Sequence, residues 1–339
     1  MKTIVKIEIV ILAVVILVAA GMTMYAAGVF DLFKEPVILE PDPEIVATEP
    51  ETQPARIGED VLPQPTEPAV EPKQESGEVS RTITAKKYFI YDVRTGEYLD
   101  TKGGKNEKLY PASITKLLTS YVVLQYMKPE DTVVVGDALN LVQEGSSLAN
   151  LQRGDKLTVA QLIAGMMLPS GNDAAQVAAV AAGRVIAGDK DLSYEKAVAV
   201  FVKEMNEQAE ALGMKNSHFE NPDGWHHENH YTTMADLVKL SEKVLAEPEI
   251  TKHTCTAGKT VSLAGRKQTW NNSNLLLHTQ NESYIPATIG LKTGFTTPAG
   301  NCLISAFFEE DRVILIGVFG CPKQTQDRYL DVEALYNSL

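Results

Sequence analysis

The stretch Pro111-Ala112-Ser113-Ile114-Thr115-Lys116-Leu117-Leu118-Thr119 leads directly into a strongly apolar run over residues 117–127. Proline is favoured in the first turn of a helix, and the apolar run predicts a buried helix. Residues three apart share one helix face, so the Lys116 amine can reach the Ser113 hydroxyl. A serine hydroxyl becomes a good nucleophile when a base removes its proton, and burial lowers the pKa of a lysine towards that role. The pair taken alone is a weak signal, because a helix start followed by a solvated lysine is then the better explanation.

Two further short motifs carry polar groups that suit a cleft. Ser170-Gly171-Asn172 lies in a turn between two apolar segments, where a hydroxyl and a carboxamide can project together. The alternative is an ordinary helix N-cap at Ser170 or Asn172. Lys292-Thr293-Gly294 ends a short predicted strand over 288–291, and offers a cation and a hydroxyl to a carboxylate, with room for close approach at the glycine. Each triplet is weak by itself.

Strands at both ends of the chain enclose a helical middle. Residues 87–93 and 98–99 have the pattern of a strand, a turn and a strand, and short apolar runs with turn residues between them follow in the last third. These later strands are predicted over 287–291, 302–308 and 313–319, before a closing helix over 328–339. The remaining helices are predicted over 159–168, 174–186, 194–212 and 233–245, with Ser193 and Thr232 as N-caps. This order predicts a mixed α/β (α+β) domain, an antiparallel sheet flanked by helices with a helical lobe.

The N-terminal 80 residues differ in character from the rest. Lys2 and Lys6 precede an apolar run over residues 9–30, long enough for a membrane span, and the charge pattern directs the C-terminal bulk outwards. A cleavable signal peptide is the alternative, and both interpretations export the protein. Residues 35–80 hold 9 of the 17 prolines and 12 acidic against 2 basic residues, a net charge of −10. We therefore predict an anchor or signal segment (1–30), an acidic disordered linker (31–80) and one folded domain (81–339).

The charge and cysteine content exclude some classes of protein. The net charge is −13, and most of it belongs to the linker, which argues against a nucleic-acid partner. Three cysteines, Cys255, Cys302 and Cys321, are too few for a disulfide framework. We expect three small core residues, with a bridge between Cys302 and Cys321 as the alternative.

The three motifs become informative together, in this order, with about 55 and about 120 residues between them. With the flanking strings they resemble the D-alanyl-D-alanine carboxypeptidase family, also called low-molecular-mass penicillin-binding proteins, over roughly residues 82–339. The matching strings are Pro111-Ala-Ser-Ile-Thr-Lys116, Leu168-Pro-Ser-Gly-Asn-Asp-Ala-Ala175, His218-Phe-Glu-Asn-Pro-Asp-Gly224, His230-Tyr-Thr-Thr-Met-Ala-Asp-Leu237 and Gly290-Leu-Lys-Thr-Gly-Phe-Thr-Thr-Pro-Ala-Gly-Asn-Cys302.

The resemblance implies a serine β-lactamase-like fold and a role for each motif residue. Ser113 looks like the acylated nucleophile and Lys116 like its base, while Ser170 would pass a proton to the departing amine. Asn172 would hold the substrate amide, and Lys292, Thr293 and Gly294 would bind the terminal carboxylate. The backbone N–H groups of Ser113 and Phe295 would form an oxyanion hole. The positive charges of Lys116 and Lys292 are expected to lie close enough for Lys292 to help lower the pKa of Lys116.

The implied reaction removes the terminal D-Ala from peptidoglycan stem peptides through an acyl-enzyme, outside the cytoplasm, and β-lactams would acylate the same serine. No metal or organic cofactor is implied. The histidine-rich segment 224–230 places His226 and His230 four apart, but Glu228 does not fit the His-Glu-x-x-His pattern of a zinc peptidase. We expect a polar loop with His230 in the core.

Three alternatives stay open at this point. A DD-endopeptidase would cut cross-links and would differ in the width of the cleft near Trp225 and Phe295. A β-lactamase would turn penicillin over, although no counterpart of the acidic deacylating residue is evident. A silent receptor would bind without catalysis, which the three intact motifs and the short segment before the apolar run argue against.

Overall fold

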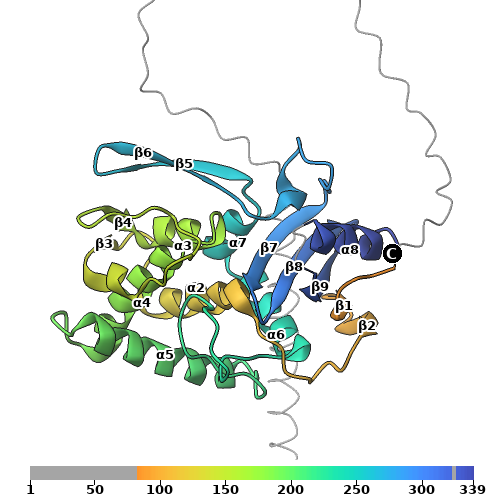
Figure 1. Cartoon of the computed structure of the whole chain (residues 1–339), viewed down its shortest axis with the longest axis horizontal. Helices are drawn as coiled ribbons and strands as arrows, with labels where there is room; N and C mark the ends of the chain where they lie inside the picture. The colour runs from red at the N-terminus through yellow and green to blue at the C-terminus, as the bar shows by residue number, and fades with distance from the viewer. Residues whose placement is uncertain (1–81, 323–325) are drawn as a thin grey trace, which may run out of the picture. The chain divides into compact units, whose positions relative to one another are not determined.

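A five-stranded antiparallel sheet supports the rest of the described chain. The computed structural model describes residues 82–322 and 326–339. The strand order is β2-β1-β9-β8-β7, so the first and last strands of the domain are neighbours (Figure 1). The strands are β1 (Lys87–Asp92), β2 (Glu97–Lys102), β7 (Thr288–Thr296), β8 (Gly300–Glu309) and β9 (Arg312–Cys321). The predicted pairing of N- and C-terminal strands is confirmed, and the fold class with it.

The central strands β8 and β9 are buried on both faces, and their alternate residues point to opposite sides of the sheet. Phe89, Ile304 and Leu315 face a core shared with the helical lobe, while Ile90, Phe307 and Ile316 face a second core beneath α8 (Asp327–Tyr336). At the register pair Phe89↔Gly317, a Cβ on Gly317 would lie 2.3 Å from the Phe89 ring. The glycine is needed there because the aromatic ring lies across its backbone.

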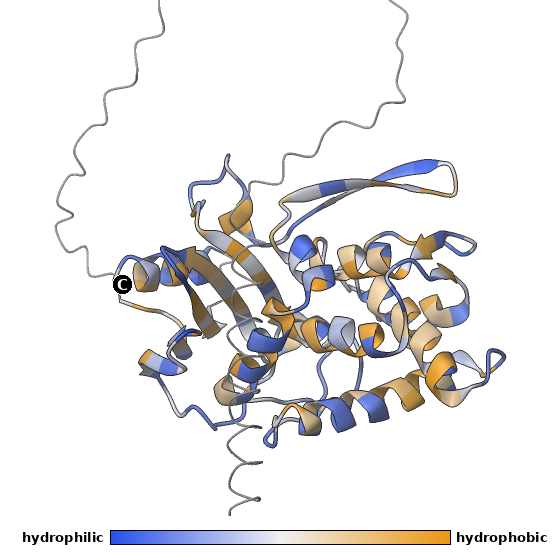
Figure 2. Cartoon of the chain, turned by 180° about the vertical axis from the view of Figure 1, so that it is seen from behind, coloured by the Kyte–Doolittle hydropathy of each residue, from blue (hydrophilic) through white to orange (hydrophobic). Residues whose placement is uncertain are grey.

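Seven described α-helices complete the fold, six of them in the middle of the chain (Figure 1). The largely apolar α3 and α4 are buried, whereas α5 has a polar outer face (Figure 2). The middle helices are α2 (Thr115–Tyr126), α3 (Val159–Met167), α4 (Asn172–Ala187), α5 (Tyr194–Ala211), α6 (Met234–Leu245) and α7 (Pro248–Thr254).

Several short elements connect these helices and strands. The 3-10 helix η1 (Ala112–Ile114) precedes α2 directly. Two small antiparallel pairs, β3 with β4 and β5 with β6, lie apart from the main sheet, and the β5–β6 hairpin extends along the lobe (Figure 1). The remaining bounds are η2 (Asp137–Leu141), η3 (Leu275–Leu277), β3 (Thr132–Val134), β4 (Lys156–Thr158), β5 (Gly258–Leu263) and β6 (Arg266–Asn271).

The structure corrects four details of the sequence analysis. The side chain that caps α6 belongs to Thr233, not Thr232, because its hydroxyl accepts the N–H of Asp236. β7 does not end at residue 291 but continues through the Lys292-Thr293-Gly294 motif. Cys255 is exposed, so it is not a core residue, and the buried Cys302 and Cys321 are free thiols. The closing helix ends at Tyr336 instead of Leu339.

The N-terminal expectations lie outside the described residues. The apolar run over 9–30 and the linker over 31–80 precede residue 82, so they stay predictions. Within residues 82–322 and 326–339, no helix is long and apolar enough to cross a membrane.

Candidate active site

Ser113 and Lys116 lie where η1 passes into α2. The Lys116 Nζ donates to Ser113 Oγ at 2.8 Å, to Asn172 Oδ1 at 2.8 Å and to the carbonyl oxygen of Asp223 at 2.7 Å. In its neutral form the amine keeps two N–H groups for Asn172 and Asp223, so its lone pair can face the serine hydroxyl. The predicted contact between residues three apart is present, and it is completed by groups from two distant segments.

Burial is the main cause of the altered titration of Lys116. The side chain is fully buried, which lowers its pKa from 10.5 to about 8, and the negative charges of Asp223 and Asp173 oppose that shift. Lys292, which was expected to help lower this pKa, is not among the causes of the shift. The pKa of Lys292 lies well below its ordinary value because of burial, and secondly because of the positive charges of Lys116 and Arg328.

Ser170 and Asn172 occupy the tight turn between α3 and α4. Ser170 has φ 61, and a Cβ on Gly171 would lie 2.7 Å from the backbone nitrogen of Ala149, so the turn packs closely on a neighbouring loop. Neither polar residue caps α4, whose N-cap is Gly171. The Asn172 Nδ2 instead donates to Ser146 Oγ at 3.0 Å, while no described residue hydrogen-bonds the Ser170 hydroxyl. The N-cap alternative for these residues is therefore wrong.

β7 carries the third motif against η1. Lys292 Nζ donates to the carbonyl oxygen of Thr293 at 3.1 Å, and the Thr293 and Ser273 hydroxyl oxygens lie 2.6 Å apart. A Cβ on Gly294 would lie 2.9 Å from the Pro111 carbonyl oxygen and 3.2 Å from the Ser113 nitrogen. Only a glycine lets the strand approach the serine backbone this closely.

These segments enclose a pocket of about 210 Å³. Six of the eight predicted site residues line it, and the other two, Lys116 and Lys292, are buried behind it. The predicted residues that line the pocket are Ser113, Ser170, Asn172, Thr293, Gly294 and Phe295. Sequence reasoning gave no role to seven further polar or aromatic residues of the lining, although it had named Trp225 as a neighbour of the cleft. They are Ser146, Ser147, Asp223, Trp225, Ser273, Thr296 and Arg328.

Arg328 on α8 is the main pocket residue that the sequence motifs did not predict. Its side chain is buried and lines the pocket, its Nη1 donates to the Gly294 carbonyl oxygen at 3.4 Å, and its Nε has no hydrogen-bond partner among the described residues. A buried guanidinium with an unused N–H can bind a carboxylate. No sequence pattern pointed to it, since it is a single arginine far along the chain from the motifs.

Asp223 contributes through both its backbone and its side chain. Its carbonyl oxygen accepts from Lys116, while its carboxylate accepts from Gln176 Nε2 and from the Trp225 backbone N–H, both at 2.8 Å. The string His218 to Gly224 contains Asp223, so the resemblance had marked the segment without giving this residue a role. The carboxylate holds the segment in place beside Lys116.

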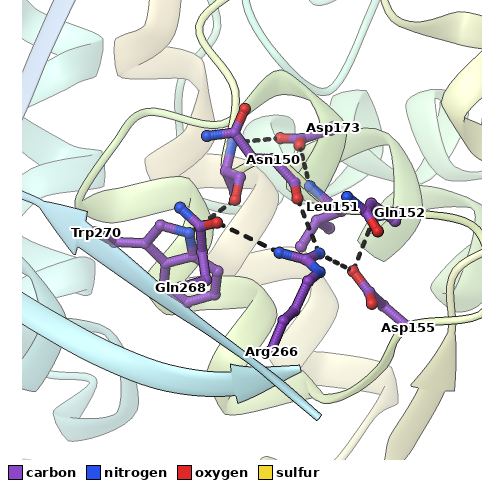
Figure 3. A network of polar contacts seen from close by, with 9 residues as sticks. Asn150, Leu151, Gln152, Asp155, Asp173, Arg266, Gln268 and Trp270 are labelled. Carbon is purple, nitrogen blue, oxygen red and sulfur yellow. Dashed lines mark hydrogen bonds and ion pairs between the residues drawn. The ribbon is translucent and has the colours of Figure 1, made fainter. Parts of the chain in front are cut away.

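The loop that carries Ser146 is held from two sides (Figure 3). The two oxygens of Asp173 accept the N–H groups of Ala149 and Leu151 at 2.8 and 2.9 Å. From the β5–β6 hairpin, Trp270 Nε1 donates to the Ala149 carbonyl oxygen at 2.8 Å. Arg266 donates to the Asn150 carbonyl oxygen at 2.9 Å and forms an ion pair with Asp155. Elements far apart in sequence therefore fix one wall of the pocket.

The histidine-rich segment places His226 and His230 in different surroundings. His230 is buried, its Nδ1 accepts the Glu220 N–H at 3.2 Å, and its Nε2 lies 2.8 Å from the Thr115 hydroxyl. His226 packs edge-on against Tyr110, with ring centroids 4.8 Å apart. No group of three potential metal ligands occurs in the part of the chain that the structure describes. The expectation of a core histidine at His230 is confirmed.

Comparison with known proteins agrees with this geometry. A sequence model of the D-alanyl-D-alanine carboxypeptidase family, peptidase family S11, matches residues 71–322. D-alanyl-D-alanine carboxypeptidase DacF of Bacillus subtilis is 30% identical over 247 residues, which are 71% of this chain and 59% of DacF. D-alanyl-D-alanine carboxypeptidase DacD of Escherichia coli is 35% identical over 248 residues, 70% of this chain and 58% of DacD. The chain thus matches less than two thirds of the length of these relatives.

Solved structures show the same fold. The Streptomyces K15 DD-transpeptidase aligns with a TM-score of 0.68 at 30% identity, over 76% of this chain and 97% of that enzyme. Penicillin-binding protein D2 from Listeria monocytogenes, in its ampicillin-bound form, aligns with a TM-score of 0.61 at 26% identity, over 75% of this chain and 97% of that protein.

Proposed function

The chain belongs to the D-alanyl-D-alanine carboxypeptidase family of serine peptidases, and from this we propose that it removes the terminal D-Ala from peptidoglycan stem peptides. One observation carries the proposal. A fully buried lysine amine, its pKa lowered to about 8, lies 2.8 Å from a serine hydroxyl at the base of a pocket. That is the arrangement of a nucleophile and its general base.

The reaction proceeds in two steps. Lys116 takes the proton of Ser113 as the serine oxygen attacks the carbonyl carbon of the penultimate D-Ala. The backbone N–H groups of Ser113 and Phe295 stabilise the developing oxyanion, a contribution typically worth about 10²–10³ in rate for one donor. Ser170 relays the proton from Lys116 to the D-Ala amine as the C–N bond breaks. Water then gives a proton to Lys116 as it attacks the ester, and the shortened peptide acid leaves while Ser113 takes a proton back from Lys116.

Substrate binding divides between two sides of the pocket. Asn172, held by Ser146, presents its amide to the peptide backbone. Thr293, Lys292 and Arg328 face the terminal carboxylate, which requires cations and a hydroxyl close together. Gly294 lets the peptide run along β7. A β-lactam presents an amide carbonyl beside a carboxylate, so it would acylate the same serine, and a family relative is known in an ampicillin-bound form.

The test uses the full chain in detergent and a diacylated tripeptide ending in D-Ala-D-Ala. Release of D-Ala by the wild type, its loss in Ser113→Ala and its retention in Ser262→Ala would support the proposal, since Ser262 is exposed on β5. Mass analysis of the penicillin adduct should place the modification on Ser113. A folded wild type without either activity would contradict the proposal. An added amine acceptor would distinguish hydrolysis from transfer, and a cross-linked dimer would test endopeptidase action.

We also propose that the protein is exported and held at the cell membrane by residues 9–30. Support comes from the length of this apolar run and the lysines that precede it. Cell fractionation combined with mass analysis of the mature N-terminus tests the idea. An intact N-terminus in the membrane fraction is expected. A soluble exported protein that begins beyond residue 20 would instead indicate a cleaved signal peptide.

A further inference from the structure

A second pocket is rich in lysine and shares no lining residue with the pocket that contains Ser113. Its volume is about 280 Å³, and Lys86, Lys87 and Lys108 line it together with Glu228, Tyr231 and Pro298. None of these three lysines belongs to a catalytic motif. Lys87 is the first residue of β1 and Lys86 directly precedes it, while Lys108 comes from the segment that leads to η1. We call this the lysine pocket.

A groove connects the lysine pocket with the catalytic pocket. The groove has a volume of about 450 Å³ and shares Trp225 and Phe295 with the catalytic pocket, and Pro298 with the lysine pocket. Both aromatic side chains are well exposed. No lysine, arginine, aspartate or glutamate lines the groove. A peptide that extends from Ser113 along this path would pass a neutral aromatic stretch and then reach the cations.

The charges of the lysine pocket are only partly balanced. Lys87 pairs with Glu107 at 2.9 Å and also donates to the Lys108 carbonyl oxygen at 3.1 Å. Lys108 Nζ lies 3.6 Å from the centroid of the Tyr231 ring, an attraction that leaves its N–H groups available. Among the described residues, no carboxylate lies within ion-pair distance of Lys86 or Lys108. Glu228 is the one acidic residue in the lining.

We propose that the lysine pocket binds a carboxylate on the part of the substrate peptide upstream of the penultimate D-Ala. This inference rests on the proposed function and adds a specificity to it. Two unpaired ammonium groups at the end of a neutral groove attract an anion, and a carboxylate in the same chain as the scissile bond benefits from being tethered. Binding energy from such a remote group can also lower the barrier at the reacting carbonyl. The enzyme therefore prefers acidic stem peptides over neutral ones of the same length.

The experiment compares pairs of acylated peptides ending in D-Ala-D-Ala. Each pair carries glutamate or glutamine at the same position, one, two or three residues upstream of the penultimate D-Ala. For at least one position, kcat/KM of the full-length enzyme should favour glutamate by about three- to tenfold at low salt, the range expected for two partly exposed charge contacts. The preference should decrease as salt rises.

Substitutions of charged residues test whether the lysine pocket causes this preference for glutamate. The preference should disappear in Lys86→Ala/Lys108→Ala, persist in Lys190→Ala on an exposed turn outside these pockets, and increase in Glu228→Gln. Release of D-Ala from the glutamine peptides should be the same in all four proteins. That rate tests the proposed function separately, so its absence would count against the peptidase and not against the lysine pocket.

A binding measurement tests the lysine pocket even if the enzyme does not turn the peptides over. The Ser113→Ala protein should bind the favoured glutamate peptide more tightly than its glutamine partner, measured by the fluorescence of Trp225 beside the groove. Equal affinities at every position would overturn the proposal. Free glutamate at the same concentration should not abolish the preference. If it does, the pocket is a site for separate anions instead of a subsite for the tethered carboxylate.

Discussion

At the scale of single residues, Lys116 links burial directly to chemistry. Its amine is held by Asn172 and the Asp223 carbonyl oxygen, and it can accept a proton from Ser113 only when it is neutral. Burial lowers its pKa to about 8, so a useful fraction of the lysine is neutral near physiological pH. The proposed role of Lys116 as a base therefore depends on where the fold places it.

The rate of acylation by penicillin should rise with pH through about 8. Below this value the ammonium form dominates, and the rate should fall about tenfold for each pH unit. The second-order acylation rate constant of a fluorescent penicillin, measured from pH 6 to 9.5, gives the profile. Lys116→Arg should be inactive throughout, because a guanidinium keeps its proton. A flat wild-type profile would rule out Lys116 as the titrating base.

His230 is also buried and neutral, but its burial affects the stability of the protein. Burial lowers its pKa from 6.5 to about 3, and the positive charges of neighbouring histidines add to the shift. Because the Glu220 N–H donates to Nδ1, the imidazole proton lies on Nε2 and is donated to the Thr115 hydroxyl. The histidine thus supports the residue immediately before Lys116.

The free energy of unfolding should decrease as the pH falls from 6.5 towards 3. The unfolded chain gains a proton on His230 that the folded chain rejects, so this contribution is complete above pH 6.5 and is lost on acidification. Its slope is about 1.4 kcal/mol per pH unit between the two pKa values. Urea unfolding at several pH values should show a shallower dependence for His230→Gln than for the wild type. Equal slopes would show that His230 does not titrate as described.

At the scale of elements, the β5–β6 hairpin stabilises the loop that forms one wall of the pocket. Trp270 and Arg266 reach the carbonyl oxygens of Ala149 and Asn150, and Arg266 also pairs with the buried Asp155 (Figure 3). The loop in turn supplies Ser146 to Asn172. The hairpin thereby influences Asn172, a side chain of the pocket that it does not touch.

Arg266→Gln should destabilise the protein by about 1–3 kcal/mol, because it leaves Asp155 and the Asn150 carbonyl without their guanidinium partner. It should also slow acylation by penicillin, since the loop that holds Asn172 loosens. Arg94→Gln is the matched control. Its partner Asp311 is exposed, and the expected change in stability is within about 0.5 kcal/mol. If the two variants unfolded at the same denaturant concentration, the hairpin would have no stabilising role.

At the scale of the whole molecule, Asp331 ties the two ends of the described chain together. Its oxygens accept the Thr84 N–H at 3.0 Å, the Thr84 hydroxyl at 2.8 Å and the Ala85 N–H at 2.7 Å. The carboxylate is buried on α8, the helix that also brings Arg328 to the pocket. Closure of the domain and completion of the site therefore depend on the same helix.

Asp331→Ala should lower the free energy of unfolding by about 3 kcal/mol or more, because buried donors lose their acceptor. For a domain of this size, that corresponds to a decrease in Tm of about 6–12 °C. Thermal unfolding should show a smaller loss for Asp331→Asn, which keeps one carbonyl oxygen, and almost none for the exposed Asp311→Ala. A Tm unchanged by Asp331→Ala would contradict the role assigned to this contact.

Much of the fold follows from local sequence patterns. Apolar patterns predicted five of the six middle helices to within a few residues, and the strands at both ends predicted one sheet. The β5–β6 hairpin was missed because most of its side chains are exposed, so it lacks the apolar alternation of a half-buried strand. The helix α7 was not predicted because its 7 residues are too few to show a helical repeat of apolar residues.

Local sequence was enough to predict the contact between Ser113 and Lys116, because local geometry sets which residues are neighbours on one helical turn. The distant groups that complete the site depend instead on long-range packing. Arg328, Ser273, Ser146 and the Asp223 carbonyl oxygen come from four separate segments, and none has a distinctive local spacing. Their positions depend on how the sheet, the lobe and α8 pack, and the same packing buries Lys116 and so lowers its pKa. Burial depends on the whole fold, which no local pattern of residues records.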